Sequence, residues 1–555
     1  MKRGEIVEGK VISVSFPNKG IVETAEGDKL RVKGVIPGQR VKVRVKKSSK
    51  EKAQGMFLEL LEKSPIEKAE PFCPHYGSCG GCCYQTLEYD KQLELKASMI
   101  KQLLAPVIGE EKFDKIFEGV KASPKQFEYR NKMEFSFGDE FKDGPLSLGL
   151  HKKGSFYDVV TVENCQNIDE DMRKVLRATL DYFKKSNQTF YKKNSHEGYL
   201  RYLLVRKAAK TGEILVDLVT STQISYIYEI ALLEGWKQAL LSEDYAGKIA
   251  GILHTKDDKE SDAVYDEGTE IIYGKSFFTE QLLDLSFTIS PFSFFQTNSL
   301  GAEVLYSTAR EFISEKADDA EVYDLYSGTG TIAQIIAPAA KHVTGVEIIE
   351  EAVEAAKENA KLNNLTNCDF IAGDVLKVLD DIEEKPDFII LDPPRDGINP
   401  KALDKIISYD VESLVYISCK PTSLARDLEV FLERGYDVKR VCCVDMFAGT
   451  YHVETVCLLS KLHEAKHHVN VKLDMDELDL TSAEAKATYK EIEEWVQEHY
   501  GFHVTNLNIA QVKQKHGIIE RENYNKPKSE NSRQPGCPEE KVKAIEEALK
   551  FFQMI

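Results

Sequence analysis

The sequence predicts an α/β protein of several domains. It should have a small N-terminal β-barrel, a mixed α+β central region, an open parallel α/β sheet and a small, mainly helical C-terminal extension. The chain has 555 residues, more than one hydrophobic core usually organises. Residues 4–62 alternate apolar and polar positions between turn residues, which is typical of short strands. From about Glu321 to Ser460 a strand, a glycine turn and a helix recur, which is the pattern of a parallel α/β sheet.

The composition is that of an ordinary globular chain, with 42% hydrophobic and 30% charged residues. Mean hydropathy is −0.35, and no apolar run reaches the roughly 18 residues that a membrane span needs. Residues 1–10 hold a Lys-Arg pair but no apolar segment or cleavage site, so no signal peptide is expected. We therefore expect a cytoplasmic protein that does not bind a membrane. Its eleven cysteines would be reduced and serve packing, metal binding or catalysis.

The first predicted domain, residues 1–62, is basic although the whole chain carries a net charge of −18. It holds 14 Lys and Arg residues against 8 Asp and Glu residues. Residues 41–46 alternate strictly between valine and a basic residue, so one face of that strand is buried and the other is positive. About five strands in 60 residues fit a small barrel of the OB type, which often binds RNA. A solvated charged face remains the alternative.

The second predicted domain, residues 63–275, contains a cysteine-rich loop. Cys73, Cys79 and Cys82 follow a C-x5-C-x2-C spacing among glycines that let the backbone wrap around a metal or cluster. Cys83 would point away, and the distant Cys165 is the candidate for a fourth ligand. Zinc is possible, a radical S-adenosylmethionine enzyme is disfavoured by the spacing, and unliganded loop cysteines are the alternative.

The third predicted domain, residues 276–460, contains the parallel sheet. Its first strand runs into Tyr326 and Ser327-Gly328-Thr329-Gly330, a turn that lets a ligand approach the backbone. The next strand ends at Glu347, where a carboxylate accepts hydrogen bonds from ribose hydroxyls, and a third ends near Asp374. The chain has no P-loop sequence, so nothing supports ATP hydrolysis. An acid after each strand suits S-adenosylmethionine better than a pyrophosphate.

Two further strands of this sheet end in candidate catalytic groups. One ends at Asp392, followed by two prolines that stiffen the loop. The other ends at Cys419, beside a lysine and before a helix start, where a thiolate is favoured. An isolated cysteine would more often be a core residue, but this position favours a nucleophile.

The final strand of the third domain carries an acid within an apolar run. Glu454 is either a tolerated edge residue or a base whose pKa burial raises. His452 is interpreted as a structural or RNA-contacting residue instead of the base.

The C-terminal extension, residues 461–555, begins with a charged stretch. Helical periodicity follows over residues 483–499 and 540–552, and Pro and Asn residues punctuate 523–537 between them. The sequence does not indicate a role for this extension.

Together these motifs resemble the RNA uracil-C5 methyltransferase family, the enzymes that make 5-methyluridine in ribosomal or transfer RNA. The resemblance covers residues 1 to about 460 and includes Tyr129-Arg130-Asn131-Lys132 and Phe294-Phe295-Gln296-Thr297-Asn298. It implies a TRAM-type barrel and a Rossmann-like class I methyltransferase domain. Two departures are Lys420, where the family usually has Asn, and Ala448-Gly449, where it usually has Pro-His.

The resemblance also implies cofactors and site residues. A [4Fe-4S] cluster would be held by Cys73, Cys79, Cys82 and Cys165. S-adenosylmethionine would contact Gln296, Tyr326, Glu347 and Asp392, with Cys419 as the nucleophile and Glu454 as the base. The implied partner is RNA, most of all 23S ribosomal RNA, and no obligate protein partner is expected.

Three alternative functions stay open at this point. One is methylation of a uridine in the transfer RNA T-loop. A second is an RNA amino-methyltransferase, which needs neither Cys419 nor Glu454. A third is a redox-sensing RNA-binding protein with an inactive α/β domain.

Overall fold

The computed structural model describes residues 1–47, 53–261, 263–313, 319–381, 385–462, 489–500, 502–516 and 538–551. The chain forms two compact units, residues 1–464 and 465–555, which are described separately.

The N-terminal strands close into a five-stranded barrel with the order β1-β2-β3-β5-β4, as the alternation of valines predicts. Val22, Leu30, Val41 and Val43 fill its interior. Tyr84, from the cysteine-rich loop, packs into the same core, so the barrel and that loop share a hydrophobic cluster. The strands are β1 (Ile6–Ser15), β2 (Lys19–Thr24), β3 (Lys29–Lys33), β4 (Arg40–Lys47) and β5 (Gln54–Glu62).

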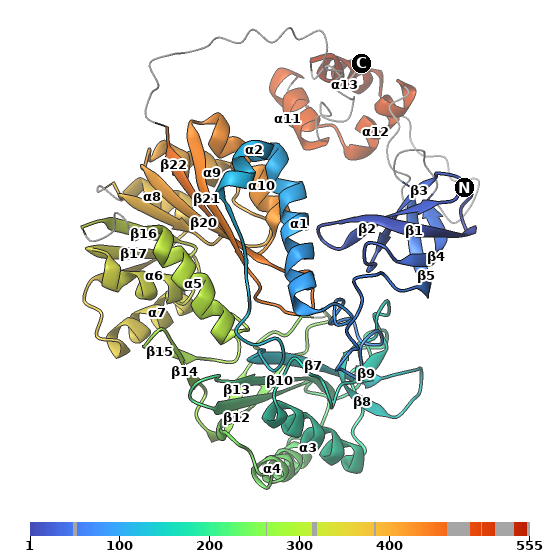
Figure 1. Ribbon diagram of the computed structural model, residues 1–555, viewed down its shortest axis with the longest axis vertical. Coiled ribbons are helices and arrows are strands. Elements are labelled where there is room, and N and C mark those ends of the chain that lie inside the picture. Colours follow the sequence, from blue (N-terminus) through green and yellow to red (C-terminus); the bar gives the residue numbers. More distant parts are fainter. Residues whose placement is uncertain are drawn as a thin grey trace. The chain divides into compact units, whose positions relative to one another are not determined.

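The central region is a seven-stranded sheet with the order β13-β12-β11-β10-β7-β8-β9. Helices α3 and α4 cover one face and bury Phe183 and Trp236 against it (Figure 1). The strands are β7 (Lys132–Asp139), β8 (Leu146–His151), β9 (Val159–Thr161), β10 (Leu200–Lys207), β11 (Glu213–Thr220), β12 (Lys248–Lys256) and β13 (Thr269–Gly274), and the helices are α3 (Glu170–Ser186) and α4 (Tyr226–Leu241). The alternating sequences of residues 200–206 and 214–219 predict two strands, and β10 and β11 cover both segments.

The α/β sheet has eight strands in the order β18-β17-β16-β19-β20-β22-β21-β6. The first five are parallel, as their buried apolar runs predict, and β22 pairs antiparallel with β20. The strands are β16 (Glu321–Leu325), β17 (His342–Glu347), β18 (Cys368–Ala372), β19 (Phe388–Leu391), β20 (Ser413–Ser418), β21 (Tyr436–Val444), β22 (Glu454–Lys461) and β6 (Phe117–Lys121).

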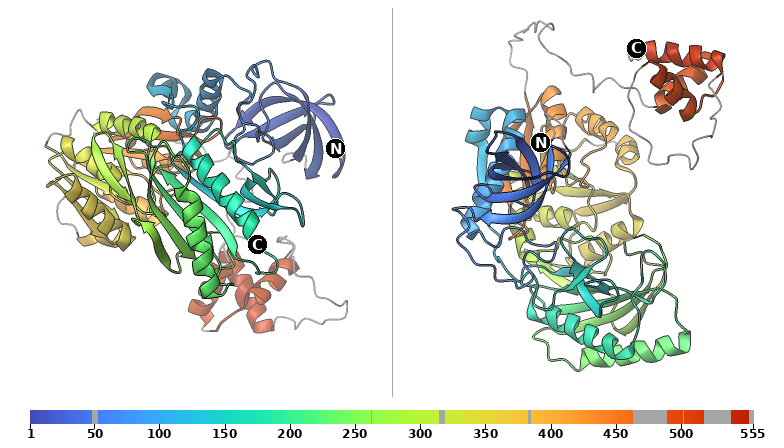
Figure 2. Two further views of the ribbon diagram at one scale, coloured as in Figure 1. Left: turned by 90° about the horizontal axis from the view of Figure 1, so that it is seen from below. Right: turned by 90° about the vertical axis from the view of Figure 1, so that its right-hand side faces the viewer.

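Helices lie on both faces of this sheet, as Figures 1 and 2 show. They are α5 (Ser299–Ile313), α6 (Thr331–Ile336), η1 (Ala337–Ala339), α7 (Glu350–Leu362), α8 (Val375–Asp381), α9 (Pro400–Ser408) and α10 (Pro421–Glu433). A short hairpin of β14 (Phe278–Leu282) and β15 (Leu285–Ile289) precedes α5. Phe278 and Phe287 of this hairpin pack into the hydrophobic core of the α/β sheet. The hairpin is therefore part of the α/β domain.

The structure differs from the predicted boundary between the central and α/β domains. Residues 89–121 belong by sequence to the central region, yet α1 (Tyr89–Ile108) and α2 (Glu110–Ile116) pack on the α/β sheet. Strand β6 extends that sheet by pairing with β21. The sequence did not indicate this, because an edge strand of five residues carries no mark of a partner more than 300 residues away.

The described residues of the C-terminal unit form three helices, α11 (Tyr489–Tyr500), α12 (Asn506–Lys515) and α13 (Glu539–Phe551). Ile492, Val496, Ile509, Ile545 and Leu549 form its core. Helices α11 and α13 agree with the predicted periodicity, whereas the short α12 was not predicted. Residues 483–488, 523–537 and 552 of the predicted segments lie outside the described residues.

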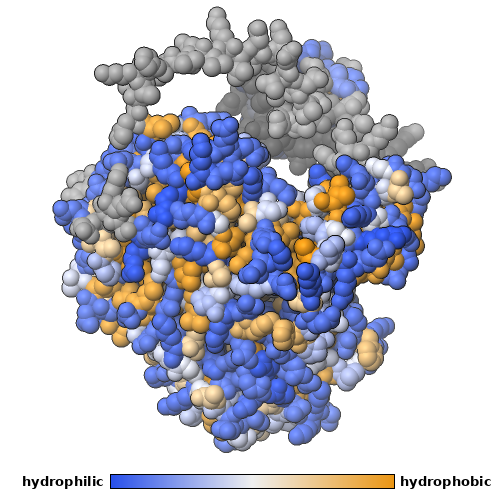
Figure 3. All heavy atoms as spheres, in the orientation of Figure 1, coloured by the Kyte–Doolittle hydropathy of each residue, from blue (hydrophilic) through white to orange (hydrophobic). Residues whose placement is uncertain are grey.

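Hydrophilic residues predominate on the face shown in Figure 3, with apolar residues in small groups between them. Among the described residues, we find no helix with the length and hydropathy of a membrane span.

Candidate active site

A cavity of about 1300 Å³ lies at the carboxyl ends of the parallel strands. Residues that follow β16, β17, β19 and β20 line it, together with the start of β22 and the loop before α5. Carboxyl ends of parallel strands meet at one edge, so residues far apart in sequence converge there. The cavity brings together all six residues proposed for cofactor binding and catalysis, namely Gln296, Tyr326, Glu347, Asp392, Cys419 and Glu454.

The turn after β16 has the backbone that its glycines predict. Gly328 and Gly330 have φ values of 55° and 71°, and a Cβ at Gly330 would lie 2.4 Å from the ring of Phe370. Tyr326 also has a positive φ, 70°, which is unusual for a residue with a side chain. Its N–H and that of Ser327 both donate to the Val346 carbonyl at 3.0 Å, which holds the turn against β17.

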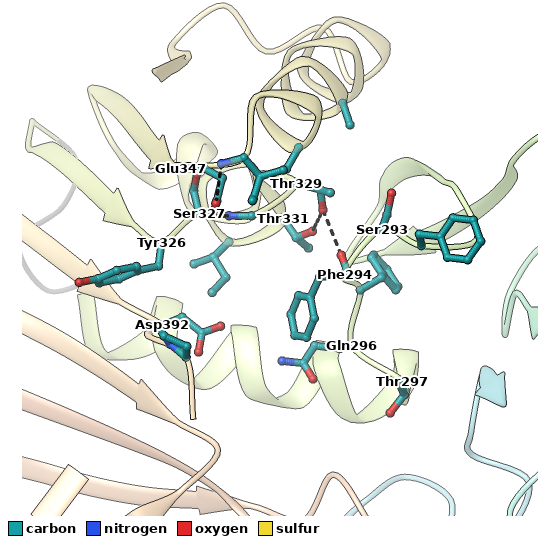
Figure 4. A pocket seen from close by; sticks show the side chains of 18 of the residues that line it. Ser293, Phe294, Gln296, Thr297, Tyr326, Ser327, Thr329, Thr331, Glu347 and Asp392 are labelled. Atoms are coloured by element: carbon teal, nitrogen blue, oxygen red, sulfur yellow. Dashed lines mark hydrogen bonds between the residues drawn. The ribbon is translucent and has the colours of Figure 1, made fainter. Parts of the chain in front are cut away.

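Glu347, at the end of β17, lies on one side of the cavity (Figure 4). Its carboxylate accepts hydrogen bonds from the N–H groups of Gly328 and Ile349, each at 3.0 Å. These bonds fix the carboxylate toward the glycine turn. Each oxygen keeps a lone pair for a further donor such as a ribose hydroxyl.

Gln296 and Asp392 lie together on another side of the cavity (Figure 4). Asn131 holds the loop that carries Gln296, because its side-chain amide donates to the Gln296 carbonyl at 2.8 Å and to Ser299 Oγ at 2.7 Å. Burial raises the pKa of Asp392 to about 7. Asp374 does not line the cavity; its carboxylate accepts from the Leu376 N–H and caps α8.

Cys419 and Glu454 both line the cavity, and the pKa of each is raised. Burial, and next the charge of Asp392, raises the pKa of Glu454 to about 8. Burial, and then Glu454 and Asp392, raises the pKa of Cys419 to about 11. The expectation that this position favours a thiolate is therefore wrong, because desolvation and two carboxylates outweigh the nearby Arg395.

Two residues of the cavity were not singled out by the sequence analysis. Arg395, three residues after Asp392, lowers the pKa of both Cys419 and Glu454. Tyr306 of α5 is buried beside Gln296, Asp392 and Glu454. Arg395 directly follows the Asp392-Pro393-Pro394 motif, so the sequence offered a signal for it. Tyr306 lies within a helix, and nothing in the sequence around it indicates a functional role.

The loop that leads to Glu454, residues 445–450, is held by several distant segments. Lys96 of α1 forms an ion pair with Asp445 at 2.6 Å, and both side chains are fully buried. Lys96 also donates to the Phe447 carbonyl at 3.2 Å, and Gln92 accepts from the Gly449 N–H at 2.8 Å.

Segments carrying other motifs reach the same loop. The N–H groups of Cys83 and Tyr84 donate to the Gly449 carbonyl at 2.8 and 2.9 Å. Tyr129 donates to the Ala448 carbonyl at 3.1 Å, and Asn298 donates to the Met446 carbonyl at 2.9 Å. The loop therefore stands where four segments of the chain meet.

The four cysteines of the predicted cluster site lie near one another. Cys73, Cys79 and Cys165 are buried, Cys82 is partly buried, and none forms a disulfide. Burial is the main cause that raises the pKa of Cys165 to about 12, and the other three thiols each add to it. Cys83 instead packs against the barrel core.

A single metal ion fits this set poorly, because a zinc ion needs its sulfur ligands at about 2.3 Å from one centre. Within the described residues, no three His, Cys, Asp or Glu side chains surround such a centre. An iron–sulfur cluster takes one thiolate per iron and so spaces them further apart. The donor set of four thiols fits such a cluster.

The sheet, the glycine turn and the acids at its edge are those of a class I S-adenosylmethionine-dependent methyltransferase. The structure is similar to the crystal structure of Pyrococcus abyssi tRNA (uracil-54, C5)-methyltransferase in complex with S-adenosyl-L-homocysteine. The TM-score is 0.62 at 25% sequence identity, over 81% of this chain and 100% of that one.

A sequence model of the tRNA (uracil-5-)-methyltransferase family matches residues 88–462. The chain is also 50% identical over 461 residues to an uncharacterised RNA methyltransferase of Caldanaerobacter subterraneus, covering 83% of this chain and all of that one. A similar protein of Clostridium tetani is 48% identical over 82% of this chain and 98% of its own length. The chain therefore belongs to the tRNA (uracil-5-)-methyltransferase family.

The buried pair predicts a large effect of Lys96→Met on stability. The substitution leaves Asp445 as an uncompensated buried charge, so the free energy of unfolding should fall by about 3–5 kcal/mol. Urea denaturation measures it. Lys91→Met, on the exposed face of the same helix, should leave stability unchanged.

Adding Asp445→Leu to Lys96→Met should recover part of the loss, since an apolar pair needs no counter-ion. A Lys96→Met protein as stable as the wild type would contradict the role of the pair.

Proposed function

We propose that the protein methylates carbon 5 of a specific uridine in 23S ribosomal RNA through a transient bond between Cys419 and the uracil ring. The observation that carries the proposal is that Cys419, Glu454 and the cofactor-side residues Tyr326, Glu347 and Asp392 line one cavity. An amino-methyltransferase would need neither Cys419 nor Glu454. A binding-only protein would have no use for the arrangement as a whole.

The first step makes carbon 5 nucleophilic. The Cys419 thiol gives its proton to water, its sulfur bonds to carbon 6, and the electrons of the C5=C6 bond move to form an enolate. Because the pKa of Cys419 is about 11, the thiolate is scarce before attack and Arg395 supports it. The target base must leave its stack to enter the cavity, which favours an unpaired uridine.

Bound S-adenosylmethionine supplies an electrophilic methyl group for carbon 5. Glu347 would accept hydrogen bonds from the ribose hydroxyls of the cofactor. Tyr326, Gln296 and Asp392 would form the other cofactor contacts. Glu454 then takes the remaining proton from carbon 5. Those electrons restore the C5=C6 bond, and the bond between sulfur and carbon 6 breaks. A pKa near 8 makes Glu454 a stronger base than an ordinary carboxylate.

The choice of 23S ribosomal RNA rests on the resemblance to the branch with a TRAM-type barrel and a cysteine cluster site. A transfer RNA uridine is the second candidate, because the P. abyssi enzyme is named for uridine 54 of transfer RNA. Mapping 5-methyluridine in both RNAs from a deletion strain separates the two. If the deletion strain lacks 5-methyluridine only in 23S ribosomal RNA, the ribosomal substrate is supported. If it lacks 5-methyluridine only in transfer RNA, the transfer RNA substrate is supported.

A [4Fe-4S] cluster on Cys73, Cys79, Cys82 and Cys165 is part of the same proposal. It supplies a structural cross-link, since the methyl transfer involves no net oxidation or reduction. The loop that holds it also donates two N–H groups to Gly449, so an ordered cysteine loop supports the segment before Glu454.

Cys419→Ala should reduce methyl transfer at least roughly 1000-fold while S-adenosylmethionine still binds. RNA containing 5-fluorouridine should trap a covalent adduct with the wild type and none with Cys419→Ala. Glu454→Gln should accumulate a methylated adduct with ordinary RNA, because elimination lacks its base. Gel electrophoresis under denaturing conditions detects these adducts. Methylation by Cys419→Ala at the wild-type rate would refute the mechanism.

The pKa of Glu454 sets the expected pH dependence. The base acts in its ionised form, so kcat/KM should rise with pH through about 8. Arg395→Gln removes a cation that lowers the pKa of Glu454, so the inflection should move to higher pH. Arg434→Gln, a surface control paired with Asp404, should leave the inflection in place. An unmoved inflection in Arg395→Gln would contradict this assignment.

Cys165→Ser should lower the iron content of protein purified without oxygen, together with its visible absorbance. Cys83→Ser is the matched control and should keep the iron, because Cys83 packs against the barrel. Iron analysis measures both. Wild-type protein that binds no iron after reconstitution would rule out the cluster.

A further inference from the structure

The loop between β8 and β9 presents two exposed aromatic rings. Phe156 is 80% exposed and Tyr157 is 59% exposed. The two rings are adjacent in sequence, and unpaired bases of RNA stack on exposed aromatic side chains.

Hydrogen bonds hold this loop in one shape. Lys152 donates through its N–H to the Asp158 carbonyl at 2.8 Å, and Lys153 donates to the Ser78 carbonyl at 2.8 Å. Ser155 Oγ accepts from the N–H of Asp158 at 3.1 Å. The two rings are therefore presented on an ordered support, which reduces the entropy lost when a ligand binds.

Three lysines lie in this loop or contact its backbone. Residues 151–157 include Lys152 and Lys153 and no acid. Lys193 Nζ donates to the Phe156 carbonyl at 3.3 Å. Lys153 extends toward the barrel, where its Nζ lies 6.0 Å from the centre of the Phe57 ring. Aromatic rings among lysines form the surface that single-stranded nucleic acid binds.

The loop adjoins the rim of the cavity. Gly80 donates through its N–H to the His151 carbonyl at 3.1 Å, and the backbones of Cys79 and Lys152 form an isolated antiparallel β-bridge. Gly81, the next residue, lines the cavity itself. A strand of RNA that enters the cavity with one base reaches this loop with neighbouring nucleotides.

We propose that residues 151–157 form a binding site for unpaired nucleotides that flank the target uridine. Phe156 and Tyr157 stack on bases, and Lys152 and Lys153 contact phosphates. This inference rests on the proposed function for its RNA substrate, but it concerns binding and not the chemical step.

The test measures binding of the full-length protein to a stem–loop RNA with unpaired uridines, by fluorescence anisotropy at fixed salt. Phe156→Ala/Tyr157→Ala should raise Kd roughly tenfold or more, and Phe156→Trp/Tyr157→Phe should stay near the wild type. The matched control is Tyr226→Ala/Ile227→Ala on α4, two residues 66% and 84% exposed. This control should bind like the wild type.

Two further measurements separate stacking from charge. When the same RNA is annealed to its complement, Phe156→Ala/Tyr157→Ala should bind it with the wild-type Kd. The duplex offers no unpaired base for the rings to stack on. Lys152→Gln/Lys153→Gln should weaken binding to both RNAs and flatten the salt dependence. 4-Thiouridine beside the target should cross-link to the peptide that contains Phe156 and Tyr157.

Stem–loop binding by Phe156→Ala/Tyr157→Ala as tight as the wild type overturns the proposal, as does an equal loss in the α4 control. These assays do not require methyl transfer. If the RNA binds at the loop but no 5-methyluridine forms, the proposed function fails and the binding site stands.

Discussion

The loop of residues 445–450 is the constraint on which the catalytic arrangement depends. Its anchor is the ion pair of Lys96 and Asp445, both removed from water, so each charge needs the other. Around this pair, α1, the cysteine-rich loop and the segments of Tyr129 and Asn298 all hydrogen-bond to the loop backbone. The segment before Glu454 is thus held by side chains and backbone N–H groups from four parts of the chain.

The same burial that orders the cavity also sets its chemistry. Asp392 and Glu454 lie in a desolvated space where both acids are weakened, and Cys419 is protonated more firmly than an ordinary thiol. Arg395 is the cation that offsets these effects. For the nucleophile that we propose, this burial raises the free energy needed to form a thiolate.

The central sheet contributes more than a support. Asn131, just before β7, holds the Gln296 loop, and the buried Arg206 of β10 donates to the carbonyls of Pro291 and Ser293 in the segment before it. The cofactor side of the cavity is therefore built partly by the central region. Under our proposals, loop 151–157 binds RNA beside the segment of Gly80 and Gly81, which also reaches this cavity.

The strands of the parallel sheet and the residues at their carboxyl ends followed from the sequence alone, because apolar runs, glycine turns and terminal acids are local signals. For the same reason Tyr326, Glu347, Asp392, Cys419 and Glu454 could be singled out before the structure, whereas Gln296 was named only from the family resemblance. The pairing of Lys96 with Asp445, the capture of β6 by β21 and the effect of Arg395 depend on contacts between distant segments, which leave no local trace. The protonation of Cys419 was misjudged because it depends on how much water the folded cavity excludes. That quantity exists only once the chain has packed.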